Sequence, residues 1–191
     1  MIIGITGGTG CGKTTALSAI SQLGGLVIDC DQVYHDLLKT DKALLSAIES
    51  RFPGTVEDGA LNRQKLASIV FSDEEALLDL NAITHKAVKE EVLHLLQTES
   101  KLVAIDAIGL FEGDLASLCD ATVAVTAPEE VRIQRLTNRD GITKEQAQAR
   151  IKAQKRQDWF IANCHYHLHN GGTEESFLED CMNLFQKLIL K

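Results

Sequence analysis

The residues near the start of the chain combine glycines, a lysine and a hydroxyl group at a spacing that suits phosphate binding. The segment from Gly7 to Thr14 reads Gly-Gly-Thr-Gly-Cys-Gly-Lys-Thr and fits the pattern G-x-x-x-x-G-K-[ST]. In this pattern backbone N–H groups surround a phosphate chain, the lysine reaches the β- and γ-phosphates, and the hydroxyl residue binds Mg²⁺. Glycine is needed because a side chain would block the approach of the backbone to the phosphates. The predicted nucleotide-binding residues are Gly8, Thr9, Gly10, Cys11, Gly12, Lys13, Thr14 and Thr15.

Other interpretations of the same loop are less favourable. A dinucleotide-binding loop needs G-x-G-x-x-G, and when Gly8 and Gly10 begin that pattern, its last position falls on Lys13. A glycine-rich turn without a ligand is the remaining alternative. We interpret Cys11 as a small residue that fills space in the loop rather than as a nucleophile. The loop therefore indicates a protein that binds nucleotide phosphates, with Lys13 as a catalytic residue.

One apolar segment ends in a carboxylate that suits a metal ion. Residues 102–105 are Leu-Val-Ala-Ile, and Asp106 follows them directly. Enzymes with this phosphate loop use such an aspartate to bind Mg²⁺ or its water shell. Thr14 and Asp106 are therefore the predicted metal ligands, and capping of the following loop is the alternative role for Asp106.

A second apolar segment is followed by two carboxylates. Residues 26–28 are Leu-Val-Ile, and Asp29-Cys30-Asp31 comes next. Open α/β folds bind ligands at the carboxyl edge of the sheet. We expect one of these aspartates to face an acceptor hydroxyl beside the γ-phosphate. The alternative is that Asp31 caps a helix that begins at Gln32.

The apolar segments predict the sheet that must position these groups. Residues 1–5, 26–28, 102–105 and 121–125 form continuous apolar runs, and a weaker strand is expected at 166–168. Such runs are typical of parallel strands covered by helices on both faces. We predict an α/β fold of the P-loop NTPase type, a three-layer sandwich with a parallel sheet.

The chain, with 191 residues, has room for one domain with additions to its core. Between the second and third strands the sequence carries helical signals only, interrupted at Pro53-Gly54 and Asp58-Gly59. This insertion is a natural place for acceptor specificity. The predicted parts of the single domain 1–191 are the core (1–31, 101–131 and 158–191), a helical acceptor-binding insertion (32–100) and a helical lid (132–157).

Helix signals after the fourth strand define the lid. Pro128 suits a helix start and Gly141 a helix end. Thr143 and Gln146 have the spacing of a capping box, which predicts a second helix that runs past Arg156.

The lid is strongly basic. Between Arg132 and Arg156 lie eight Lys and Arg residues but only two acidic ones, Asp140 and Glu145. A loose phosphoryl-transfer transition state needs positive charge on its equatorial oxygens, and a closing arginine supplies that charge while excluding water. We interpret each arginine other than Arg139 as part of a solvated helix face paired with nearby acids.

A regulatory GTPase is the main rival from a different functional class. Residues 106–109 spell D-x-x-G, a motif that guanine-nucleotide switches use. The base-reading motif N-K-x-D is lacking, since its nearest candidate is Thr137-Asn138-Arg139-Asp140 at the end of a helix. The insertion and the basic lid favour a small-molecule kinase that uses ATP and Mg²⁺.

Composition narrows the partners and the compartment. The formal charge of −8 and a pI near 5.2 disfavour a nucleic-acid binder. The five cysteines are odd in number and form no C-x-x-C pair, which favours a reducing cytoplasm. We also expect no signal peptide, no membrane span and no obligate protein partner.

With these motifs placed, the chain resembles the dephospho-CoA kinase family from its first strand to about residue 172. Taken together in this order, the matching segments are far more specific than a phosphate loop alone. Besides that loop, the segments that carry the resemblance are Val27-Ile28-Asp29-Cys30-Asp31, Gly59-Ala60-Leu61-Asn62-Arg63 with Val70-Phe71, Leu80-Asn81-Ala82-Ile83-Thr84-His85, Leu110-Phe111-Glu112, Arg135 through Gly141, Ala149-Arg150-Ile151 with Gln154, and Asn170-Gly171.

The resemblance implies ATP-dependent phosphorylation of the ribose 3′-hydroxyl of dephospho-CoA, the last step of CoA synthesis. By the same analogy Asp31 orients or deprotonates that hydroxyl, Arg139 meets the transferring phosphate, and Arg63 and His85 lie in the acceptor region. Another small-molecule kinase is the alternative. Three segments depart from the usual family pattern, which implies a differently shaped acceptor pocket: Tyr34-His35, Lys86 and Ala107-Ile108-Gly109.

Overall fold

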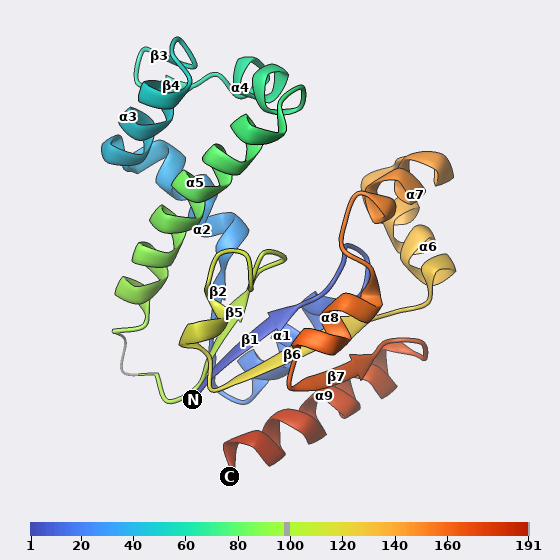
Figure 1. Cartoon of the computed structure of the whole chain (residues 1–191). Helices are drawn as coiled ribbons and strands as arrows, with labels where there is room; N and C mark the ends of the chain where they lie inside the picture. The colour runs from blue at the N-terminus through green and yellow to red at the C-terminus, as the bar shows by residue number, and fades with distance from the viewer. Residues whose placement is uncertain (98–99, 191) are drawn as a thin grey trace. The chain divides into compact units, whose positions relative to one another are not determined.

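The computed structural model describes residues 1–97 and 100–190, which form two compact units (Figure 1). The first unit comprises residues 1–28, 100–111 and 115–190, and the second comprises residues 29–97 and 112–114. The second unit includes nearly all of the predicted insertion.

A five-stranded sheet organises the first unit (Figure 1). The spatial order of its strands is β2-β5-β1-β6-β7. The central strand β1 runs parallel to both of its neighbours, and β6 runs parallel to β7. This arrangement confirms the α/β fold with a parallel sheet and the weaker strand after residue 165. The strands are β1 (Ile2–Thr6), β2 (Leu26–Asp29), β5 (Val103–Asp106), β6 (Ala121–Thr126) and β7 (Tyr166–His169).

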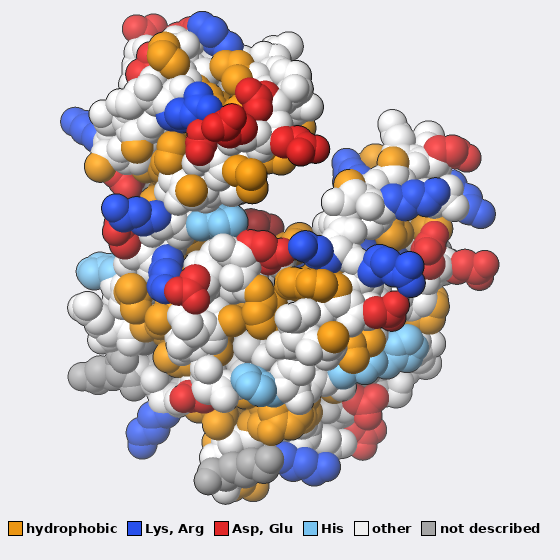
Figure 2. Space-filling model, viewed as in Figure 1, with side chains coloured by type: hydrophobic (Ala, Val, Ile, Leu, Met, Phe, Trp, Pro, Cys, Tyr) orange, Lys and Arg blue, Asp and Glu red, His pale blue; other side chains and the backbone are white. Residues whose placement is uncertain are grey.

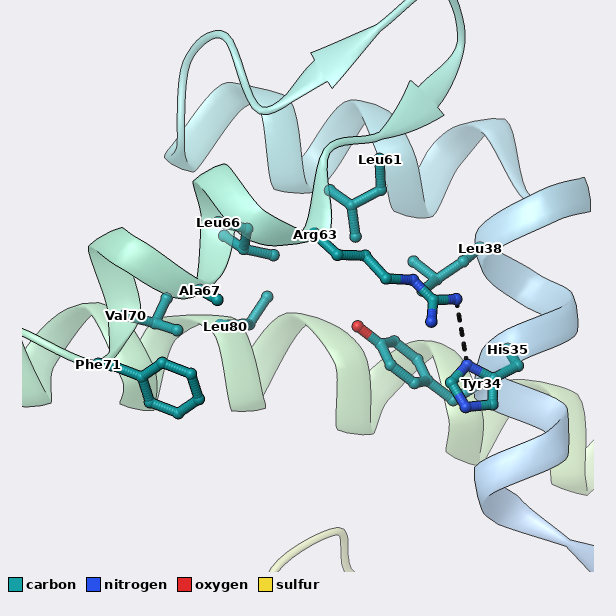
Figure 3. A pocket seen from close by; sticks show the side chains of 10 residues that line it. All are labelled: Tyr34, His35, Leu38, Leu61, Arg63, Leu66, Ala67, Val70, Phe71 and Leu80. Atoms are coloured by element: carbon teal, nitrogen blue, oxygen red, sulfur yellow. Dashed lines mark hydrogen bonds between the residues drawn. The ribbon is translucent and has the colours of Figure 1, made fainter.

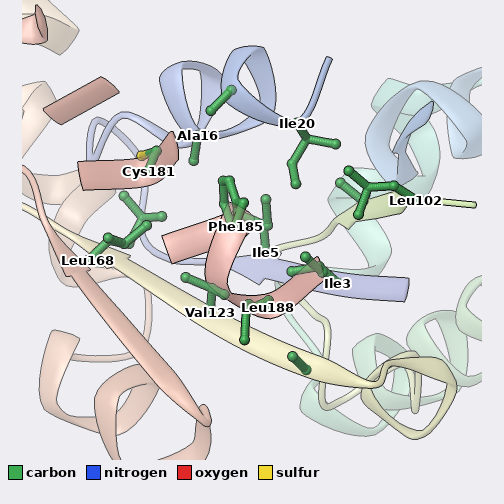
Figure 4. Packing of buried hydrophobic residues seen from close by; sticks show 14 of the residues in the cluster. Ile3, Ile5, Ala16, Ile20, Leu102, Val123, Leu168, Cys181, Phe185 and Leu188 are labelled. Atoms are coloured by element: carbon green, nitrogen blue, oxygen red, sulfur yellow. The ribbon is translucent and has the colours of Figure 1, made fainter. Parts of the chain in front are cut away.

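Helices α1 (Lys13–Gln22) and α9 (Glu174–Ile189) pack against each other and against this sheet. Figure 4 shows their buried side chains between helix and strand, including Ile20 from α1 and Phe185 from α9. Each fully buried side chain of this size contributes roughly 1.5–3 kcal/mol relative to its exposed state. The core therefore fixes both strands and helices around the loop that joins β1 to α1.

Two short helices complete the connections near the sheet. Helix α8 (Gln157–Asn163) contacts β6, and its Phe160 is fully buried. A 3-10 turn, η1 (Ala116–Leu118), precedes β6.

The second unit is built from four helices and a small hairpin. The helices are α2 (Cys30–Thr40), α3 (Lys42–Arg51), α4 (Arg63–Val70) and α5 (Glu74–Leu95), and the hairpin strands are β3 (Val56–Glu57) and β4 (Ala60–Leu61). Each helix begins after a side chain that accepts hydrogen bonds from its first turn, which is a strong start signal. In the part of the chain that the structure describes, no helix is both long and apolar enough to cross a bilayer.

The hairpin corrects the prediction that this insertion is helical only. Asp58 (φ 51°) and Gly59 (φ 78°) connect antiparallel strands β3 and β4. A two-residue turn with positive φ at both positions matches the twist of a hairpin, and Asp-Gly is a preferred sequence for it. The residues interpreted as helix punctuation therefore form the turn of a hairpin.

The lid segment contains α6 (Glu129–Asp140) and α7 (Lys144–Lys152). Gly141 ends α6 with φ 64°, and the predicted capping box at Thr143 is present. The prediction that the second helix runs past Arg156 is wrong, since α7 ends at Lys152. After α7 ends, Gln154 accepts a hydrogen bond from the Thr9 N–H and Gln157 accepts one from the Ala127 N–H, both at 2.8 Å.

Candidate active site

The loop between β1 and α1 has the backbone of an anion-binding site. Gly7, Gly10 and Gly12 have φ values of 144°, 76° and 96°, a region that favours glycine. Gly12 precedes α1 without a side-chain cap, so no side-chain oxygen accepts a hydrogen bond from the first turn of the helix. A helix start of this kind attracts phosphate through its free N–H groups and its dipole.

Close packing behind the loop also requires glycine. A Cβ atom on Gly7 would lie 2.2 Å from the carbonyl oxygen of Val125 in β6. A Cβ atom on Gly12 would lie 2.1 Å from Nδ2 of Asn170. The sheet and the segment after β7 thus hold the loop from behind.

Three of the predicted nucleotide-binding side chains differ in their surroundings. Lys13 Nζ donates to the Gly7 carbonyl oxygen at 3.1 Å, so its ammonium group lies over the loop. Thr14 is exposed, whereas Cys11 is buried in the core. Burial raises the pKa of the Cys11 thiol, although the nearby Arg132 and Lys13 lower it in part. A buried thiol of raised pKa suits the role of a space-filling residue.

Asp106 ends β5 and lies beside β1. The register pairs Asp106 with Ile5, and the Ala107 N–H donates to the Ile5 carbonyl oxygen at 3.2 Å. Because Gly7 follows β1 almost directly, the sheet brings this carboxylate to the end at which the loop begins. Carboxylate and hydroxyl oxygens are the protein ligands that Mg²⁺ takes, so Asp106 and Thr14 fit the predicted metal.

Two arginines of α6 hold the loop instead of facing solvent. Arg132 is only 3% exposed, and its Nε donates to the Thr9 carbonyl oxygen at 2.9 Å. Arg135 Nη1 donates to the carbonyl oxygens of Gly10 and Cys11 at 3.3 and 3.4 Å. The prediction of a solvated helix face is therefore wrong for Arg132 and Arg135.

Polar side chains from two further segments contact the same loop. Asn170 Nδ2 donates to the Cys11 carbonyl oxygen at 3.0 Å, and its Oδ1 accepts from Arg135 Nη2 at 2.9 Å. Gln154, just after α7, accepts from the Thr9 N–H at 2.8 Å. The sequence motifs contain Gln154 and Asn170 but assign them no role. The three-residue spacing of Arg132 and Arg135 within one helix is the signal that places them on a common face.

Arg139 and Arg150 have a different environment at the far end of α6. Both donate to Asp140, with Arg139 Nε–Oδ1 and Arg150 Nη1–Oδ2 distances of 2.7 Å. The arginine side chains are 64% and 53% exposed, and the surface over α6 and α7 carries basic and acidic groups together (Figure 2). Hydrogen bonding from Arg139 lowers the pKa of Asp140. Arg139 is thus accessible, as a residue that closes over a substrate must be.

In the second unit, Asp29 rather than Asp31 caps α2. The Asp29 carboxylate accepts from the N–H groups of Asp31 and Gln32 at 2.9 and 3.1 Å. The alternative role of Asp31 as the cap is therefore wrong. Asp31 is exposed in the first turn, and no hydrogen bond or ion pair within the described chain engages its carboxylate.

Arg63 lines a pocket of about 210 Å³ in the second unit (Figure 3). Its Nη2 lies 3.2 Å from Nδ1 of His35, and Tyr34 lies on the same side of the pocket. Burial raises the pKa of Tyr34, while the charge of Arg63 lowers it in part. His85, in α5, is not one of the residues that line this pocket. The apolar residues that complete the lining are Leu38, Leu61, Leu66, Ala67, Val70, Phe71 and Leu80.

Comparisons with known proteins identify the family to which the chain is similar. A family model described as dephospho-CoA kinase matches residues 1–175. The dephospho-CoA kinase of Syntrophotalea carbinolica is 35% identical, with 99% of this chain and 92% of the relative covered. A crystal structure of a Thermus thermophilus protein has a TM-score of 0.81 and 31% identity over 98% of this chain and 97% of its own. The dephospho-CoA kinase of Campylobacter jejuni, at 24% identity, shares the fold with a TM-score of 0.70 over 98% and 96% of the two chains.

Proposed function

This chain belongs to the dephospho-CoA kinase family, and we propose that it transfers the γ-phosphoryl group of ATP to the ribose 3′-hydroxyl of dephospho-CoA. The products are CoA and ADP. The observation that carries the proposal is the glycine loop: no side chain caps the start of α1 that follows it, and Arg132 and Asn170 hold the carbonyl groups of Thr9 and Cys11. A loop prepared in this way suits the diphosphate portion of a nucleotide.

We assign the nucleotide to residues 8–15. The backbone of the loop binds the α- and β-phosphates, and Lys13 exchanges its bond to Gly7 for the β- and γ-phosphate oxygens. Mg²⁺ fits the oxygen ligands of Thr14 and Asp106, and when bound it neutralises charge on the phosphates.

For the acceptor we assign Asp31 and the pocket of the second unit. Because Asp29 caps α2, the Asp31 carboxylate does not have to cap this helix, which supports its role in orienting the hydroxyl and accepting its proton. Arg63 supplies a positive group for the phosphates of dephospho-CoA, and the apolar wall of the pocket suits the uncharged parts of that molecule. His85 lies outside this wall, and we assign it a role at the edge of the acceptor region.

Arg139 supplies positive charge to the phosphoryl group during transfer. Its exposure supports this role, because rotation of the side chain lets the guanidinium leave its hydrogen bonds to Asp140 and donate to a phosphate instead. We also propose a cytoplasmic location, which the five free thiols support.

The test is an ADP-release assay with the purified protein, ATP and Mg²⁺. ADP is expected to be released from ATP when dephospho-CoA is present, and removal of the new phosphate by a 3′-nucleotidase, followed by mass spectrometry, identifies its position. A panel of nucleosides, nucleotides and small alcohols serves as the comparison. Absence of activity on dephospho-CoA, together with clear activity on another acceptor, would contradict the proposal and favour a different small-molecule kinase.

A further inference from the structure

We propose that Arg132 is a positioning residue for nucleotide binding, which acts on the phosphates through the backbone of the loop rather than by direct contact. The inference rests on the proposed function, since it takes the segment from Gly7 to Thr14 to be the phosphate-binding loop. It adds a residue of α6 to the machinery at a place where the sequence predicted a solvated side chain.

Arg132 packs closely against the backbone of the loop. At 3% exposure, the side chain donates from Nε to the Thr9 carbonyl oxygen at 2.9 Å. A Cβ atom on Gly8 would lie 2.5 Å from Nη2 of Arg132, and one on Gly10 would lie 3.0 Å from its carbonyl oxygen. Two glycines of the loop are thus needed to admit this one arginine and the turn of α6 that carries it.

The hydrogen bond from Arg132 sets the direction of a donor on the opposite side of the loop. In a trans peptide the C=O group and the following N–H group point in opposite directions. Arg132 holds the Thr9 carbonyl oxygen toward α6 and thereby directs the Gly10 N–H away from α6. Asn170 holds the Cys11 carbonyl oxygen and directs the Gly12 N–H in the same manner. Within the described chain neither of these N–H groups donates to a protein acceptor, so both are available to a ligand.

The charge of Arg132 also lacks a partner. Among the ion pairs of residues 1–97 and 100–190, none includes Arg132, and its buried Nη2 has no hydrogen-bond partner. This differs from Arg139 and Arg150, which share a carboxylate. Taking an unpaired cation out of water is costly, and an anion bound on the other side of the loop offsets that cost. A cationic donor on a carbonyl group also polarises the peptide and strengthens its N–H as a donor.

The experiment compares three variants by isothermal titration with ADP and Mg²⁺. Arg132→Met removes both the charge and the donor, Arg132→Lys keeps the charge without the planar fork, and Arg156→Met is the control. Arg156 belongs to the same basic segment, but its side chain is 88% exposed and pairs with Asp158. Arg132→Met is expected to raise the Kd for ADP by at least about tenfold, which corresponds to about 1.4 kcal/mol. Arg132→Lys should give an intermediate Kd, and Arg156→Met the wild-type value.

The KM for dephospho-CoA separates positioning from general damage. We expect it to stay within about twofold of wild type in Arg132→Met, because the loss is confined to the nucleotide loop. Wild-type affinity for ADP in Arg132→Met, or a parallel loss of affinity for ADP and dephospho-CoA, would overturn the inference. If Arg132→Met fails to fold, wild-type affinity in Arg132→Lys would overturn it. ADP binding and dephospho-CoA turnover by the wild-type protein test the proposed function separately.

Discussion

Replacement of Gly12 by alanine tests how the phosphate loop is built. A Cβ atom at this position would lie 2.1 Å from Nδ2 of Asn170, a distance that no side chain tolerates. Asn170 is 3% exposed and cannot move without losing its bonds to the Cys11 carbonyl oxygen and to Arg135. The substitution therefore disturbs Asn170 and Arg135, two side chains that hold the loop from behind.

The structure contains a matched control for the backbone cost. Gly24 has φ 79°, close to the 96° of Gly12, but a Cβ atom there would meet nothing within 4 Å. A left-handed conformation destabilises the folded state by roughly 1–2 kcal/mol when the residue is alanine. Alanine also restricts the unfolded chain more than glycine does, and this offsets about 0.4–1 kcal/mol of the loss. Gly24→Ala is expected to lower the free energy of unfolding by about 1 kcal/mol. Gly12→Ala adds two lost hydrogen bonds, one of them from a cation, and is expected to cost about 4 kcal/mol.

Urea unfolding and thermal melting of the two variants measure the difference. With about 2–4 °C per kcal/mol for a chain of this size, Gly12→Ala should melt roughly 10 °C below wild type and Gly24→Ala only a few degrees below. Titration with ADP should show weak or absent binding for Gly12→Ala and wild-type binding for Gly24→Ala. Equal losses of stability in the two variants would refute the reasoning, because they would show that Asn170 yields without cost.

Four further outcomes follow from the site. Asp31→Asn should lower kcat by about 100-fold or more while the Kd for ADP is unchanged, since the residue accepts a proton and holds no nucleotide. Arg139→Ala should lower kcat by about 1,000-fold and change the KM for dephospho-CoA far less, as measured by steady-state kinetics. Arg63→Ala should raise the KM for dephospho-CoA by about tenfold through loss of a charge-assisted contact. Burial raises the pKa of Cys119 and of Cys181 to about 12. Labelling of these two cysteines by a thiol reagent should therefore be slow at pH 8, accelerate as the pH rises, and become fast on unfolding.

Controls for these variants lie close to the residues they match. Asp36, in the same helix as Asp31, pairs with Lys39, and Asp36→Asn should retain normal turnover. Arg150 shares Asp140 with Arg139, so Arg150→Ala should lose much less kcat than Arg139→Ala. An equal effect of the two arginine substitutions would assign Arg139 to the structure of the lid. Near-normal turnover in Asp31→Asn would remove Asp31 from the chemistry. Rapid labelling of Cys119 and Cys181 in the native protein at pH 8, located by peptide mapping, would contradict their raised pKa values.

The phosphate loop and the sheet could be predicted because their signals are local. The first 22 residues contain a strand, the glycines, the lysine and a helix in this order, and each core strand is a continuous apolar run. Helix ends at Gly141 and Thr143 were predictable for the same reason, since capping involves residues only a few positions apart. The hairpin at Asp58 was missed although its signal is also local, because the two strands beside it have only two residues each.

The roles of individual polar side chains depended on residues far away in the sequence. Arg132 and Thr9 are 123 positions apart, and Asn170 and Cys11 are 159 apart. Nothing near Arg132 in the sequence distinguishes it from Arg139, yet one is buried against the loop and the other is exposed. The sequence alone determined the fold class, the nucleotide loop and the type of chemistry, because these rest on short-range patterns. Only the tertiary structure decided which arginines hold the loop and which remain free to meet a substrate, because burial and charge pairing arise when distant segments pack together.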